Sequence, residues 1–111
     1  MEMNKETEAQ IRELQMLEQN LQNILMQKQA FQLELSETEN AFEELTKNSG
    51  EVFKISGNIM IKSSKENILK DLKQKKDLIS LRLKSLDSQE KSISSTSENL
   101  RKKVLAGMKK E

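Results

Sequence analysis

The side chains that could do chemistry in this 111-residue chain are almost all carboxylates and amines. There is no His and no Cys, which removes the usual general base at neutral pH, thiol nucleophiles, disulfides and the common zinc ligands. The carboxylate pairs Glu37/Glu39 and Glu43/Glu44 have no partner at metal-ligand or acid–base spacing, and the three glycines stand too far apart for a phosphate-binding loop. We therefore expect no enzyme activity and no metal, nucleotide or other cofactor.

Basic residues gather near the C-terminus, at Arg101, Lys102, Lys103, Lys109 and Lys110. They have no aromatic neighbour for stacking on bases, and the end of a helix favours cations through its dipole, so we expect no nucleic-acid partner. No apolar run approaches the ~20 residues that span a bilayer, and the N-terminus lacks a signal-peptide core. The sequence predicts a soluble, cytoplasmic protein without a membrane partner.

Apolar residues between about 5 and 48 follow a heptad repeat. Eight of ten seam positions (a and d of the heptad) are apolar, which is typical of a coiled-coil helix. These positions are Leu14, Leu17, Leu21, Ile24, Lys28, Phe31, Leu35, Thr38, Phe42 and Leu45. The helix is expected to end at Asn48-Ser49-Gly50, because Asn and Gly suit a left-handed C-cap.

A second heptad repeat occupies residues 64–109. Eight of its eleven seam positions are apolar. They are Leu69, Leu72, Lys76, Ile79, Leu83, Leu86, Glu90, Ile93, Ser97, Leu100 and Val104. Ser63 and Glu66 have capping-box spacing, which places the start of the helix at Ser63 or Ser64. The Ser/Thr-rich run 92–97 is expected to loosen the distal third of this helix.

The two predicted helices carry opposite charge. Residues 1–48 hold ten acidic and four basic side chains, a net of −6, and residues 49–111 hold eight and fifteen, a net of +7. Opposite charge and a linker of about sixteen residues favour antiparallel pairing, in which Lys28 and Glu90 fall close together and fix the register. With no Pro to interrupt the helices, we expect a mainly α fold, a long antiparallel two-helix coiled coil formed by a single rod-like domain over residues 1–111.

Residues 51–62 change to the alternating pattern of strands, with a short three-residue turn at Ser56-Gly57-Asn58 that predicts a β-hairpin. We expect Phe53 and Ile55 to be matched across the hairpin by Ile59 and Ile61. Because an isolated two-stranded hairpin is marginal in water, we expect it to recruit strands of other subunits. The predicted oligomerisation residues are Val52, Phe53, Ile55, Gly57, Ile59, Met60 and Ile61.

Antiparallel pairing brings both chain ends to the tip remote from the hairpin. Four of the six methionines lie there, and Met surfaces can repack against many apolar partners. The predicted binding residues at this tip are Met1, Met3, Ile11, Leu14, Met16, Val104, Leu105 and Met108. The alternative is that Leu14 and Val104 only complete the seam and the methionines are disordered end residues.

The order helix, β-hairpin, helix, with Gln27-Lys28-Gln29 in the first helix and Phe53-Lys54-x-x-Gly57-Asn58-Ile59-x-Ile61 in the hairpin, resembles the beta-class subunit of prefoldin. The resemblance covers essentially the whole chain, which has room for one hairpin where alpha-class subunits carry two. It implies a hetero-hexamer of two alpha and four beta subunits, with hairpins assembled into an intersubunit β-barrel platform.

The same resemblance implies an ATP-independent chaperone, a holdase, that captures unfolded proteins at the coiled-coil tips and delivers them to a group II chaperonin. A share of the C-terminal basic residues would then contact the chaperonin or an acidic client protein. A structural coiled-coil scaffold or tether, in which the hairpin only joins two helices, is the alternative function.

Overall fold

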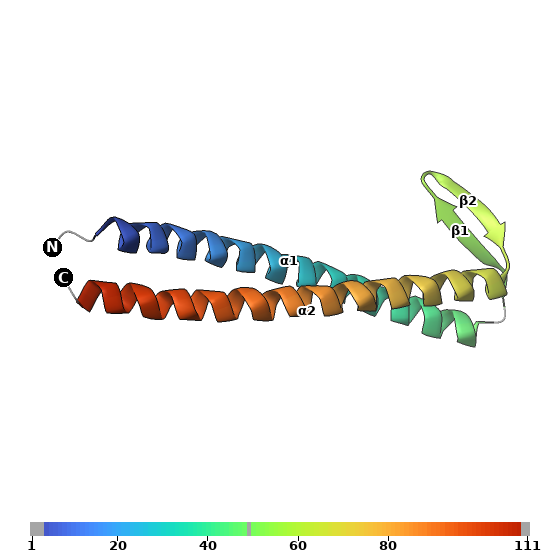
Figure 1. Cartoon of the computed structure of the whole chain (residues 1–111). Helices are drawn as coiled ribbons and strands as arrows, with labels where there is room; N and C mark the ends of the chain where they lie inside the picture. The colour runs from blue at the N-terminus through green and yellow to red at the C-terminus, as the bar shows by residue number, and fades with distance from the viewer. Residues whose placement is uncertain (1–3, 49, 110–111) are drawn as a thin grey trace. The chain divides into compact units, whose positions relative to one another are not determined.

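The computed structural model describes residues 4–48 and 50–109 of the chain. Its elements follow in the order α1 (Lys5–Lys47), β1 (Val52–Ser56), β2 (Ile59–Ser63) and α2 (Lys65–Lys109), as Figure 1 shows. The predicted fold class is confirmed, because two long helices flank one antiparallel two-stranded hairpin. Neither described helix contains a stretch apolar enough to cross a membrane.

The chain divides into two compact units, each of which contains parts of both helices. The terminal unit consists of residues 4–29 and 84–109, and the hairpin unit of residues 30–83. Within the terminal unit the helices are antiparallel, since Arg101 binds Glu18 at 3.1 Å and Lys28 binds Glu90 at 2.6 Å. Within the hairpin unit the antiparallel pairing is marked by Lys75 and Glu34, at 3.4 Å.

The seam of the terminal unit is buried where the heptads predict it. Apolar side chains fill most of its layers, and the buried ones are Ile24, Leu86, Leu100 and Val104. The buried stripe also continues to Thr7 in the first turns of α1, beyond the positions that the heptads identified. Asn4 begins this helix, because its Oδ1 accepts a hydrogen bond from the Thr7 backbone N–H at 2.7 Å.

Lys28 and Glu90 pair across the seam as the register argument predicts. The Lys28 ammonium also lies 2.6 Å from Asp87 Oδ1, a partner that the seam pattern missed because Asp87 flanks the seam. The Lys28 side chain is only 19% exposed. The hydrogen bonds with Asp87 and Glu90 raise the pKa of Lys28 above its ordinary value.

Replacing Lys28 with Gln is expected to lower the melting temperature at neutral pH, because it removes the cation between two carboxylates. Since the pKa of Lys28 is raised on folding, its stabilisation is complete below pH 10.5 and is lost as the pH rises through the folded-state pKa. The difference between the wild type and the variant, followed by circular dichroism, should therefore vanish in strong alkali. Lys102→Gln is the control, because within the described residues Lys102 has no ion-pair partner.

Two of the buried hydroxyl groups, those of Thr38 and Ser97, differ in their hydrogen bonds. Thr38 Oγ1 donates to the Glu34 carbonyl at 2.7 Å, which satisfies it within its own helix. Ser97 is 6% exposed, and its Oγ has no hydrogen-bond partner within the described part of the chain. Burial of a hydroxyl without a partner destabilises the seam at this layer.

Ser97→Ala is expected to stabilise the chain by about 1–2 kcal/mol, because it removes the unpaired hydroxyl and raises helix propensity. Thermal unfolding should show a melting temperature higher by several degrees. Ser95→Ala is the matched control, since Ser95 is exposed two residues away and gains only the propensity. Equal shifts for both variants would mean that the Ser97 hydroxyl costs nothing.

The helix ends beside the hairpin differ from the predicted caps. Ser64 begins α2, because Ser64 Oγ accepts a hydrogen bond from the Asn67 N–H at 3.1 Å. Ser63 is the last residue of β2, so the predicted capping box of Ser63 and Glu66 does not form. Gly57 alone has a positive φ among the described residues, so the predicted left-handed cap at Asn48 or Gly50 is wrong; Ser49 lies outside the described residues.

The C-terminal end of α1 is satisfied instead by a side chain from the other helix. Lys65 Nζ donates to the carbonyl oxygens of Asn48, at 2.8 Å, and Thr46, at 3.4 Å. Asn48 Oδ1 in turn accepts from the Gly50 N–H at 2.9 Å. A lysine therefore provides the donor that a left-handed glycine cap would have supplied from the backbone.

Candidate functional site

The β-hairpin is the first candidate site, and its register differs from the predicted one. Phe53 pairs with Lys62, and Ile55 pairs with Met60, so Ile59 and Ile61 belong to the opposite face. The turn consists of Gly57 and Asn58, with Gly57 at a φ of 61°, the pattern of a type II′ turn. A two-residue turn shifts the pairing by one residue from the expected three-residue turn, and one residue exchanges the faces.

Both faces of the hairpin are consequently apolar and exposed. One face presents Phe53, Ile55 and Met60, and the other presents Ile59 and Ile61, with Val52 half-buried beside them. The exposed fractions range from 48% at Phe53 to 69% at Ile55. Five large apolar side chains on a two-stranded ribbon form a surface that needs a partner on each side.

The tip of the terminal unit is the second candidate site, and the predicted tip residues other than Met16 fall into three groups there. Val104 is buried and Leu14 half-buried, so both belong to the seam. Leu105 and Met108 are 53% and 47% exposed, and Ile11 is half-buried. Met1 and Met3 lie outside the described residues.

The helix register brings three of these side chains to one face. The bridge between Glu18 and Arg101 joins positions that flank the seam on one side. Ile11 lies one heptad before Glu18 and Met108 one heptad after Arg101, so the same antiparallel register places Ile11 opposite Met108. Leu105 precedes Met108 by three residues and shares its side of α2. We refer to Ile11, Leu105 and Met108 as the tip face.

Met16 does not belong to the tip face. It is 65% exposed, but it lies two residues before Glu18, which at 100° per residue turns it to nearly the opposite side of α1. The prediction grouped it with the others by position along the chain alone, and the helical rotation separates them.

Other exposed apolar side chains were missing from the predicted sites. In the terminal unit they are Leu25 and Met26, and in the helices of the hairpin unit they are Leu33, Leu78 and Leu81. Their heptad positions off the seam already marked them as exposed, so the signal was available in the sequence. Leu25 follows Glu18 by one heptad and therefore lies on the same side of the coiled coil as the tip face.

Comparison with known proteins supplies the family. The family model for the prefoldin subunit matches residues 8–111, which includes both helices and the hairpin. The chain belongs to the prefoldin family. The prefoldin beta subunit of Archaeoglobus fulgidus is 36% identical over 94 residues, covering 83% of this chain and 81% of that protein. The prefoldin beta subunit of Pyrococcus furiosus is 31% identical over 106 residues, with coverages of 94% and 91%.

The structural comparison agrees with the sequence comparison. The crystal structure of the prefoldin beta subunit from Thermococcus strain KS-1 superposes with a TM-score of 0.87 at 28% identity, covering 95% of this chain and 94% of the other. The resemblance to a beta-class subunit is thereby confirmed. Prefoldin is a chaperone family and not an enzyme family, and prefoldin subunits form oligomeric complexes with one another.

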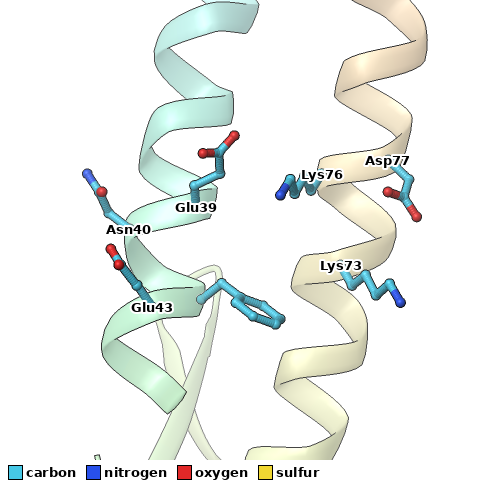
Figure 2. Close-up of a pocket in the computed structure, with 7 residues that line it drawn as sticks. Glu39, Asn40, Glu43, Lys73, Lys76 and Asp77 are labelled. Carbon is cyan, nitrogen blue, oxygen red and sulfur yellow. The ribbon is translucent and has the colours of Figure 1, made fainter. Parts of the chain in front are cut away.

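In this prefoldin chain the seam of the hairpin unit is open at one layer. Phe42 is one of the apolar positions of the predicted seam and Lys76 one of the polar ones, and both are exposed in the structure. They line a groove of about 460 Å³ whose other residues are Glu39, Asn40, Glu43, Lys73 and Asp77. Figure 2 shows Lys76 pointing toward α1 on the side of Glu39. The Lys76 ammonium stays in water because burial in the seam would cost more than the packing gains.

Proposed function

We propose that the chain is a beta subunit of an ATP-independent holdase that captures unfolded proteins at its distal tips and delivers them to a group II chaperonin. The working complex is a hetero-hexamer of two alpha-class and four beta-class subunits in the cytoplasm, without nucleic-acid or membrane partners. The observation that carries the proposal is the pairing of family membership with two separate exposed apolar surfaces, one on the hairpin and one at the tip.

The hairpin supports the assembly part of this proposal. Its five exposed apolar side chains lie on both faces, and its two outer strand edges have no neighbouring strand within the described chain. Strands from neighbouring subunits would pair with these edges and cover the faces, which is what closure into an intersubunit β-barrel accomplishes. The predicted residues Val52, Phe53, Ile55, Gly57, Ile59, Met60 and Ile61 would form this contact.

The tip face supports the capture part. It places Leu105 and Met108 in water beside the half-buried Ile11, and an exposed apolar group of this kind typically marks binding. Met108 adds a flexible, polarizable side chain that adjusts to clients of unrelated sequence. The exposed basic residues Arg101, Lys102 and Lys103 on the same helix would contact acidic clients or the chaperonin.

The test is an aggregation assay with the chain co-expressed with an alpha-class prefoldin subunit. The purified complex should suppress aggregation of several unrelated denatured proteins at a near-stoichiometric ratio without added nucleotide. The chain without its alpha-class partner is the comparison, because it has the same tip face but lacks the platform. A complex that assembles but protects no denatured protein would support the scaffold or tether function instead.

A further inference from the structure

At the end of the terminal unit the two helices approach each other closely at Thr7 and Gly107. Thr7 is only 2% exposed and lies in the first turns of α1. A Cβ atom placed on Gly107 would come within 2.6 Å of Thr7 Oγ1, a distance that real Cβ contacts do not show. The missing side chain of Gly107 therefore creates the space that the Thr7 hydroxyl occupies.

This contact adjoins the tip face on both helices. Ile11 follows Thr7 by four residues, one helical turn along the same side of α1, and Met108 follows Gly107 directly. The turn that carries Thr7 is itself fixed, because the Thr7 N–H donates to Asn4 Oδ1 at 2.7 Å. The close approach therefore fixes the distance between the two helix ends, and with it the position of Ile11 relative to Met108.

We propose that Thr7 and Gly107 are positioning residues, which lock the two helix ends together and so present Ile11, Leu105 and Met108 as one preformed face for apolar segments of unfolded proteins. This inference rests on the proposed function, and it adds that the face is fixed before a client arrives. A frayed helix end would have to become ordered on binding, and the ordering would reduce affinity.

Replacing Gly107 with Ala tests the inference, because helix propensity predicts a more stable helix end, whereas the contact with Thr7 predicts that the helix ends separate. In an ordinary helix Gly→Ala is stabilising, since Ala has the higher helix propensity. Here Gly107→Ala should instead push the ends apart, because the new methyl group would lie 2.6 Å from Thr7 Oγ1, and Thr7 is only 2% exposed, so its side chain has little room to turn. Thr7→Ala should relieve the clash, since Thr7 Cβ would remain 3.7 Å from the new methyl group, an ordinary contact.

The experiment uses the complex with an alpha-class subunit and measures two quantities. Spin labels on Cys introduced at Glu13 and Asn99 report the separation of the helix ends; the chain has no native Cys, and both positions are exposed, outside the tip face and without a role in the proposed client contact. Aggregation assays report capture. For Gly107→Ala we expect a longer and broader label distance and roughly tenfold weaker capture. For Thr7→Ala with Gly107→Ala we expect both to return toward the wild type.

Three results would overturn the inference. Gly107→Ala could keep a short label distance, or it could separate the helix ends while capture stays unchanged, and in either case Thr7 and Gly107 do not position the face. The double variant could capture as poorly as Gly107→Ala despite a restored distance. Absence of capture by the unmodified complex would overturn the proposed function as well, so the two failures are distinguishable.

Discussion

A lysine on either face of the hairpin is expected to prevent assembly of the prefoldin complex. Ile61→Lys changes one face, and Met60→Lys changes the other, although the residues are adjacent in the chain. Each variant removes an apolar side chain whose burial contributes about 1.5–3 kcal/mol and forces a charge into the contact. The loss of burial alone raises the dissociation constant roughly 10–100-fold for each copy of the chain.

Light scattering after gel filtration, with the alpha-class subunit present, checks this result. Asn58→Lys is the matched control, because it adds the same charge in the turn between the strands, outside the paired residues of both faces. Far-ultraviolet circular dichroism should show that all three variants keep their helices. If only one of the two face variants dissociated the complex, the other face of the hairpin would be open to solvent in the assembly.

The combined change of Leu105→Ser and Met108→Ser is expected to weaken capture strongly without altering assembly. The two side chains are about half exposed, so their removal leaves the seam intact while it takes away most of the exposed apolar area of the tip face. Two contacts of about 1–2 kcal/mol each correspond to a loss of affinity of roughly 30-fold or more. The ratio of complex to denatured client at half-maximal protection measures the effect.

Met16→Ser is the control for this prediction. Met16 is more exposed than Leu105 or Met108, but it lies on nearly the opposite side of α1 from the tip face. The complex with Met16→Ser should protect denatured clients as well as the wild-type complex does. Equal losses for Met16→Ser and for the double variant would mean that capture depends on total exposed apolar area at the tip and not on one face.

The helical part of the structure followed from sequence because burial repeats with the turn of the helix. The heptad pattern predicted the buried positions Ile24, Ile79 and Leu86, and the antiparallel register predicted the pair of Lys28 with Glu90. Among the described seam positions only Phe42 and Lys76 are exposed, and Lys76 is one of the charged residues on the stripe. Periodicity reports an average preference of a stripe and not the closure of one layer.

The features that the sequence did not reveal depend on single contacts. The two-residue turn at Gly57 and Asn58 determines which residues of the two strands share a face of the hairpin. The sequence pattern did not distinguish this turn from a three-residue turn, because apolar residues pair across the strands with either one. Thr7 lies one heptad before Leu14 and so continues the seam, but it is polar and precedes the first apolar seam residue, so it was not predicted to be buried. Its burial arises from the missing side chain of Gly107, a hundred residues later.

The doubly apolar hairpin also has a consequence for the cell that makes this chain. A copy synthesised in excess of its partners would expose the unpaired strand edges and both apolar faces of its hairpin. Such surfaces promote aggregation and make the chain a substrate for proteases. Orphan copies would thus resemble the damaged proteins that quality control removes. The exposed hairpin therefore favours production of this chain in balance with the subunits that cover it.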